Sequence, residues 1–322
     1  MASAQSLAAG ITAFFLDRGR LVCPAVEAGR ALIERAGMKK RILLLGYLLT
    51  ALSFSPSEAA ETISAPDLIV DGSVPLQYDS NAARTRQKQS DYVFSPFFRL
   101  SASGQLLDDF SYSVYASTGF DDYFKLKDDN VSQSATGVQA SRAWSALRLG
   151  ASYERIYYYD RLYGSQIRTA NDIQFFARYN YVNSAGDLKI RPSMSITTRA
   201  DDQFSVERTL FRFKVDLERK VADRWWIFAT PSLRVYDYVS GRLDDIYSIT
   251  TGLRYDITRD VSLTSSVGYE SRNSSSSSRN FNNMVVGLSL DFSYTLFSAG
   301  KDDKLWKTLE RPSCEDQSQL SC

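Results

Sequence analysis

The sequence contains no histidine, only three cysteines, and no long apolar run beyond its N-terminal region. Without an imidazole, the hydrolase and transferase mechanisms that use histidine as their base are excluded. The cysteine spacing matches no metal site. After residue 60, no apolar stretch reaches the roughly 20 residues that a membrane-spanning helix needs. We therefore expect a protein with no catalytic residues, no metal and no cofactor, and without membrane helices in the bulk of the chain.

Charge of one sign is also missing, since 38 Lys and Arg residues nearly balance 37 Asp and Glu residues. Such a chain has no general basic field to attract nucleic acid. Aromatic residues, in contrast, are abundant at 13% of the chain, with 19 tyrosines and 18 phenylalanines. This composition favours β-structure and membrane interfaces. The mean hydropathy of -0.26 is that of a soluble protein, so composition alone would hide a membrane protein.

The N-terminal region has the pattern of a secretory signal peptide. A basic start, Met-Lys-Lys-Arg from Met38, precedes an apolar run over residues 42–54. Small residues follow, and cleavage after Ala59 or Ala60 fits the pattern. The apolar run is too short to span a bilayer comfortably. The sequence thus predicts export by a cleaved signal peptide at residues 38–60.

The rest of the chain then divides into four parts. Residues 1–37 are interpreted as an upstream extension, translation starting at Met38, with a genuine extended leader as the alternative. A short linker, 61–66, leads into the main domain at 67–297, and 298–322 is interpreted as a periplasmic C-terminal tail. Cys314 and Cys322 lie in this tail, where they could close a small loop by a disulfide in an oxidising compartment or stay reduced.

The main domain consists of segments in which every second residue is apolar, which is the period of a strand with two different faces. The last segment is the clearest, with Met284, Val286, Leu288 and Leu290 alternating with polar residues. Twelve such segments are found, at 68–78, 92–102, 110–120, 131–143, 147–159, 173–181, 188–198, 209–217, 225–235, 247–257, 261–269 and 284–296.

Segments of this length suit tilted strands that cross a bilayer. The connections alternate between tight turns and longer polar loops, as in outer-membrane barrels with both termini in the periplasm. We expect an all-β fold: a transmembrane, antiparallel, up-and-down β-barrel of about twelve strands. The alternative is a soluble β-sandwich or lipocalin-like barrel. Prolines within the predicted strands at 96, 192 and 231 count against regular strands.

The terminal segment carries a resemblance. Val-Gly-Leu-Ser-Leu-Asp-Phe-Ser-Tyr-Thr-Leu-Phe at 286–297 resembles the closing strand of Gram-negative outer-membrane β-barrels, which ends in an aromatic residue read by the barrel-assembly machinery. The resemblance implies that Tyr294 and Phe297 carry this signal, although here the chain continues to Cys322. It also implies a location in the outer membrane, with outer-membrane lipid, lipopolysaccharide and the assembly machinery as partners. In architecture the chain is similar to the small twelve-stranded porins, without a motif specific to one family.

If the apolar residues of each strand face lipid, the alternate residues face the barrel interior. The predicted inward-facing charged residues, candidates to line a pore, are Arg99, Arg148, Glu154, Arg178, Arg191, Arg212, Arg234, Arg254, Asp256 and Glu270. One interpretation is a water-filled pore whose arginines lower the barrier for anions. The other is a set of salt bridges that stiffens a narrow barrel. Arginine's forked guanidinium suits both, so residue type does not decide.

Two further groups of residues have a general and a more specific interpretation. Tyr157–Tyr158–Tyr159 and Trp225–Trp226 are expected in the aromatic girdles of a membrane barrel, with sugar stacking as the alternative for the tyrosines. Acidic pairs such as Asp121–Asp122 and Asp244–Asp245 are expected to be solvated loop charges, with cation binding as the alternative.

The function expected from these features is a porin-like passive channel for small solutes, anions among them. The alternatives are a non-conducting structural or surface-interaction barrel with a salt-bridged interior, and an enzyme, which the missing histidine disfavours. The sequence does not indicate the solute, the oligomeric state or the role of the tail.

Overall fold

The structure is a computed structural model that describes residues 66–298, except for 85–87, 108 and 204–205. The predicted extension and signal peptide, the linker up to residue 65, and the tail from residue 299 with its two cysteines Cys314 and Cys322 lie outside the described residues. Fourteen strand segments are present in this part: β1 (Asp67–Asp79), β2 (Asp91–Phe94), β3 (Phe97–Leu107), β4 (Phe110–Tyr123), β5 (Val131–Trp144), β6 (Leu147–Asp160), β7 (Gln166–Tyr179), β8 (Tyr181–Val182), β9 (Leu188–Asp201), β10 (Arg208–Ala222), β11 (Trp225–Tyr238), β12 (Leu243–Asp256), β13 (Val261–Ser274) and β14 (Phe281–Phe297).

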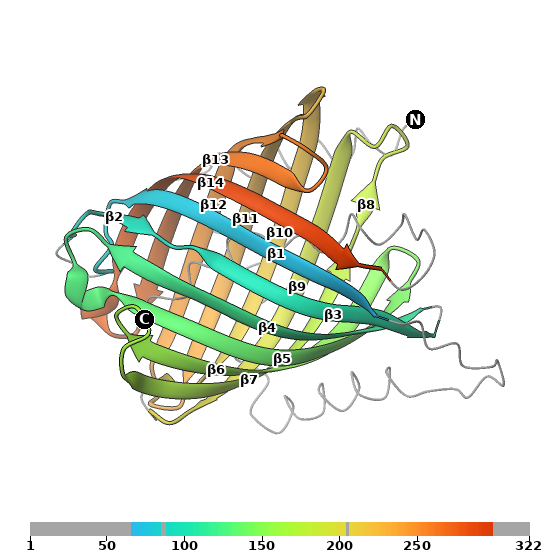
Figure 1. The fold of residues 1–322 in the computed structure, drawn as a ribbon. Helices are drawn as coiled ribbons and strands as arrows, with labels where there is room; N and C mark the ends of the chain where they lie inside the picture. Colours follow the sequence, from blue (N-terminus) through green and yellow to red (C-terminus); the bar gives the residue numbers. More distant parts are fainter. Residues whose placement is uncertain (1–65, 85–87, 108, 204–205, 299–322) are drawn as a thin grey trace. The chain divides into compact units, whose positions relative to one another are not determined.

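These segments pair into one closed antiparallel barrel (Figure 1). Each strand pairs with its neighbours in the sequence, and β1 pairs with β14 to close the ring. Because β2 and β3 share the partners β1 and β4, they form one barrel strand. The two-residue β8 pairs with β9, as β7 does, and continues β7. The barrel therefore has twelve strands, as the sequence predicted.

Both strand interruptions have a local cause. Proline has no N–H to donate to a ladder, and Pro96 lies where β2 gives way to β3; its carbonyl still accepts a hydrogen bond from the Phe120 amide at 3.2 Å. The break between β7 and β8 lies opposite Pro192 of β9: pairing with β9 stops at Arg178–Ser193 and resumes at Tyr181–Ile190, while the Asn180 amide donates to the Ala146 carbonyl at 2.9 Å. The strands that contain Pro192 and Pro231, β9 and β11, themselves continue past these prolines.

The two faces of the barrel wall differ in polarity, as the alternation predicted. Large apolar side chains such as Val138, Ile173, Leu253 and Leu288 are exposed on the outer face, where a membrane would cover them. Many of the buried side chains are serines, threonines and charged residues that point inward. A soluble barrel would show the opposite arrangement. No helix in the described part of the chain is both long and apolar enough to cross a bilayer.

The strands extend further than the periodicity suggested, so several connections are shorter than expected. The β6–β7 connection, for which the predicted segments 147–159 and 173–181 leave residues 160–172, comprises only residues 161–165. Tyr163 in this connection folds back on the wall, where its amide donates to Ser132 Oγ at 2.7 Å. The β4–β5 and β13–β14 connections each contain one turn of 3₁₀-helix, at Lys127–Asp129 and Ser277–Arg279.

The outer face provides the first prediction. Leu288, near the middle of β14, is 51% exposed on the apolar face. We expect Leu288→Arg to lower the free energy of unfolding by about 2–4 kcal/mol, because a guanidinium at the bilayer midplane loses its hydration. Denaturant unfolding of the protein folded into lipid vesicles would measure this change. The matched control is Ser266→Arg on β13, which lines the interior and should cost much less; equal losses would contradict the assignment of the two faces.

Candidate functional site: the polar interior

All ten predicted pore-lining residues lie on inward-facing positions of their strands. Their registers place them on the same set of alternate positions: Arg148 lies opposite Arg178, Glu154 opposite Asp172, and Arg212 opposite Arg234. Five of the ten line a cavity of about 410 Å³ inside the barrel: Arg99, Arg178, Arg191, Arg254 and Asp256. The other five, Arg148, Glu154, Arg212, Arg234 and Glu270, lie outside its lining.

The cavity occupies the half of the barrel in which the described chain begins and ends. Its wall includes Asn180 and Asp260 of the turns at that end, which is the periplasmic end of an outer-membrane barrel. Its ionisable lining comprises six basic residues, Arg99, Arg178, Lys189, Arg191, Lys214 and Arg254, and six acidic ones, Asp71, Asp216, Glu218, Asp256, Asp260 and Asp291. The formal charges balance, so the cavity is mixed in sign and not predominantly positive.

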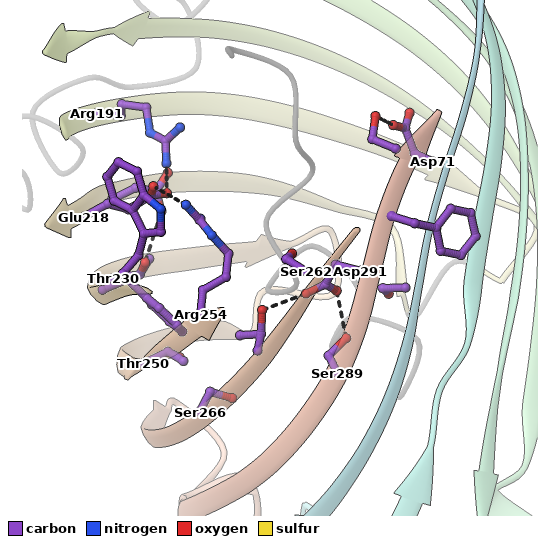
Figure 2. Close-up of a pocket in the computed structure, with 18 of the residues that line it drawn as sticks. Asp71, Arg191, Glu218, Thr230, Thr250, Arg254, Ser262, Ser266, Ser289 and Asp291 are labelled. Atoms are coloured by element: carbon purple, nitrogen blue, oxygen red, sulfur yellow. Dashed lines mark hydrogen bonds and ion pairs between the residues drawn. The ribbon is translucent and has the colours of Figure 1, made fainter. Parts of the chain in front are cut away.

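Cations are in excess on one side of the cavity and carboxylates on the other, although Asp216 and Glu218 on β10 lie among the cations. Arg178 on β7, Lys189 and Arg191 on β9, and Lys214 on β10 form what we term the cationic wall. Across the barrel, with β11 and β12 between them on one side, β13, β14 and β1 form a second wall of hydroxyls and carboxylates. There Asp291 accepts hydrogen bonds from Thr264 Oγ1 at 2.8 Å and Ser289 Oγ at 2.7 Å, and Asp71 accepts one from Ser293 Oγ at 2.6 Å (Figure 2). We term this the acid–hydroxyl wall.

An ion-pair network lies beside the cationic wall. Glu218 on β10 pairs with Arg191 on β9 and with Arg254 on β12 across the neighbouring strand, the latter at 3.2 Å (Figure 2). Arg254 also pairs with Asp256, which accepts a hydrogen bond from Trp226 Nε1 at 2.9 Å. These contacts fix the side chains at the junction of the two walls.

Arg99 has a different environment. Its guanidinium lies 4.3 Å from the centre of the Tyr115 ring, and its Nε is buried without a hydrogen-bond partner. Tyr115 in turn shares a hydrogen bond with Glu154. Arg99 is thus held by the Tyr115 ring and by its attraction to the Glu154 carboxylate, without an ion pair as close as that of Arg191 among the described residues.

The other half of the interior, toward the extracellular end, is filled by aromatic rings and arginines. Inward-facing Tyr158, Tyr236, Tyr238 and Phe281 lie within three residues of that end of β6, β11 and β14, and all four are buried. Each ring is covered by a guanidinium: Arg168 lies 3.9 Å from Tyr158, Arg208 4.8 Å from Tyr236, Arg242 3.6 Å from Tyr238 and Arg272 5.7 Å from Phe281. We term these eight residues the aromatic–arginine layer.

Ion pairs tie this layer to the wall and to a loop. Glu270 on β13 pairs with Arg234 on β11 and, at 2.8 Å, with Arg84 from the β1–β2 connection. Burial opposes the charge of Arg84, but the carboxylates of Glu270 and Asp79 raise its pKa above the ordinary value. Asp244, whose side chain is fully buried, pairs with Arg272 at 2.5 Å and Arg242 at 3.1 Å. The loop is thereby joined to two strands of the barrel wall.

The structure changes the interpretation of several residues. Only the odd-numbered tyrosines of Tyr157–Tyr158–Tyr159 face outward, and Trp226 lies inside, because neighbouring residues of a strand point to opposite faces. Asp121 and Asp244 are buried and not solvated loop charges. The described part of the chain holds no group of three or more acidic or cysteine side chains that could bind a metal ion. Tyr294 and Phe297, the predicted assembly signal, are exposed at the end of β14.

Sequence reasoning missed Arg84 and the aromatic–arginine layer. Arg84 lies in a loop, where no periodicity assigns a direction. The alternation of strand residues could have identified the inward-facing aromatic residues. Tyr158 is an even number of positions from Glu154 and Trp226 an even number from Arg234, so each faces the same side as that charged residue. Adjacent aromatics were assigned together to a girdle, although the strand period separates them.

Comparisons with known proteins agree with a porin-like barrel. A family model described as "Putative beta-barrel porin 2" matches residues 209–294, which span β10 to β14. No curated protein matches the chain. The match covers 86 of the 322 residues, so the likeness to this porin family is a likeness over β10 to β14. With the closed barrel and its exposed apolar face, the chain is an outer-membrane β-barrel that is porin-like over that part.

Several solved structures are similar to the chain at low identity. The β domain of the Bordetella autotransporter BrkA is 11% identical, with 71% of this chain and 100% of that one covered and a TM-score of 0.47. OmpT of Vibrio cholerae is 9% identical over 72% of this chain and 99% of that one, with a TM-score of 0.39. The KdgM porin is 13% identical over 68% and 99%, with a TM-score of 0.36. Likenesses this distant carry no argument about what this chain transports.

The Glu270 network provides a prediction. Glu270→Gln would remove the carboxylate charge that Arg84 and Arg234 share and leave Arg84 with the more distant Asp79 at 3.9 Å, at a site where the three side chains are only 10–21% exposed. We expect a loss of about 3 kcal/mol in the free energy of unfolding. The control is Asp122→Asn, which breaks the exposed pair with Lys127 and should cost at most about 1 kcal/mol. Denaturant unfolding measures both, and equal small losses would show that the Glu270 pairs contribute little.

Proposed function

We propose that the barrel is a passive channel for small hydrophilic solutes, in which negatively charged groups travel along the cationic wall. The observation that carries the proposal is the separation of charge across the cavity. A cavity with balanced but intermingled charges would present little net field to a solute. Four cations on neighbouring strands, facing a wall of carboxylates and hydroxyls, produce a field directed across the path.

The pairing of the acidic residues supports the same proposal. On the cationic wall, Asp216 lies 3.5 Å from Lys214 and Glu218 pairs with Arg191, so the four cations outnumber the two acids there and the wall keeps a net positive formal charge. On the opposite wall, Asp71 and Asp291 accept hydrogen bonds from the neutral hydroxyls of Ser293 and Thr264. An anion would therefore be attracted toward β7, β9 and β10, whereas the hydroxyls of the other wall could hydrogen-bond neutral parts of a solute.

The aromatic–arginine layer would be the narrowest part of the route. Its tyrosines are 3–6% exposed, which means that they pack against neighbours and do not line an open lumen. A solute that crosses the barrel must pass this layer, so we expect it to limit conductance, while the cavity walls set the charge preference.

Ion selectivity tests the proposal. We expect the full mature chain in a planar bilayer to show anion-preferring channels, from the reversal potential in a KCl gradient. Arg178→Gln combined with Lys214→Gln should shift this potential toward cation preference, because two of the four cations of the wall are lost. The matched control, Asp71→Asn with Asp291→Asn, should shift it the opposite way. A barrel that inserts but never conducts, or two variants that shift in the same direction, would overturn the proposal.

Conductance tests the role of the layer separately. We expect Tyr158→Ser to raise single-channel conductance, because it removes a buried ring from the narrow part, while leaving the reversal potential almost unchanged. Tyr157→Ser is the control, since Tyr157 lies on the outward-facing set of β6. If both variants conduct like the parent, the route does not pass Tyr158.

A further inference from the structure

The apolar outer face ends early over three neighbouring strands, β5, β6 and β7, which lie side by side in Figure 1. Val138, Tyr153 and Ile173 form a row of paired, exposed residues across these strands. The next outward-facing row toward the extracellular end is Thr136, Arg155 and Asn171, and the row after it is Ser134, Tyr157 and Thr169. Polar side chains thus replace the apolar belt from Arg155 onward.

Arg155 is the cation of this surface. It is exposed, its guanidinium lies 5.3 Å from the centre of the Tyr157 ring, and no carboxylate among the described residues pairs with it. The outward-facing positions of β5, β6 and β7 carry no acidic residue. Below Arg155, the Tyr153 hydroxyl donates to Asn171 Oδ1 at 2.8 Å, which orients this amide beside the guanidinium. The patch therefore presents a positive charge with hydrogen-bonding groups around it.

The height of Arg155 on the barrel wall indicates which layer of the membrane its side chain contacts. β6 begins at Leu147 near the periplasmic end, and Arg155 follows after eight residues. A strand tilted by about 40° climbs roughly 2.5 Å per residue along the barrel axis, so Arg155 lies about 20 Å above Leu147. Since the apolar band of such barrels is about 25 Å tall, the backbone of Arg155 lies about 5 Å below its upper edge, and the long arginine side chain can extend upward to bring the guanidinium to the headgroup level of the outer leaflet.

We propose that this patch, Thr136, Arg155, Tyr157, Thr169 and Asn171, binds the phosphorylated glucosamine headgroup of lipopolysaccharide. A guanidinium forms paired, charge-assisted hydrogen bonds with phosphate, and the hydroxyls and amide around it can bond the sugar. Lipopolysaccharide presents phosphates at this level of the outer leaflet of a Gram-negative outer membrane. The site lies on the outer face of the wall and is independent of the channel proposed above.

Native mass spectrometry of the full chain in detergent, titrated with bisphosphorylated lipid A, tests the proposal. We expect Arg155→Gln to weaken binding about tenfold, and the parent to bind dephosphorylated lipid A about as weakly as the variant does. The matched control is Arg219→Gln, because Arg219 is also exposed and outward-facing but lies near the periplasmic end of β10. This control should bind lipid A like the parent. Heat-modifiable migration on gels would verify that all three proteins are folded.

Three outcomes would overturn the proposal. If the parent and Arg155→Gln bound lipid A with equal affinity, the guanidinium would take no part in the site. If the parent bound phosphorylated and dephosphorylated lipid A with equal affinity, the phosphate would not be the group recognised. A change in the number of protomers in Arg155→Gln would instead assign the patch to contacts between copies of the barrel. Channel measurements on the same variant separate the two proposals, because Arg155→Gln should leave the reversal potential unchanged.

Discussion

Backbone hydrogen bonding is the constraint on which this structure depends. In the hydrocarbon of a bilayer an unpaired N–H or C=O costs several kcal/mol, so a sheet can persist there only if it has no free edge. The antiparallel pairing of β1 with β14 over most of their length removes that edge. The same requirement explains why Pro96 falls at a strand interruption and why the Asn180 amide is satisfied across a turn. Closure also fixes the direction of every side chain, since neighbouring residues must point to lipid or to the interior.

The interior of the barrel is packed with side chains in one half and contains a cavity in the other. Toward the extracellular end, tyrosines and arginines stack, and the β1–β2 connection is tied in through Arg84 and Glu270. Toward the periplasmic end, short hydroxyl side chains leave a cavity with charges of opposite sign on opposite walls. Salt bridges and an open polar space, which looked like alternatives, therefore coexist: buried ion pairs fix the wall, and the placement of charges gives the remaining space its field.

The outer face also differs from one region to another. Most of it is an uninterrupted apolar belt, which is what lipid chains require. Over β5 to β7 this belt stops at Val138, Tyr153 and Ile173, and an exposed arginine follows. A charge in this position is tolerated because it lies where phosphate and water are available, whereas the same charge a few residues lower would be costly. The outer-face patch and the polar interior are thus formed by alternate residues of the same strands, with Arg155 outward and Glu154 inward.

The sequence by itself determined the number of strands, the two faces of the wall and the parity of all ten predicted interior charges, because a period of two is a local property of a strand. It did not determine which charges pair, how the two signs divide between opposite walls, or that Arg84 reaches Glu270 across 186 positions of the chain. Those contacts depend on register and closure, which bring β9 opposite β1 only once the ring is complete. The tertiary structure alone decided where the interior is filled and where it is open, since packing depends on side chains from strands that are remote in the sequence.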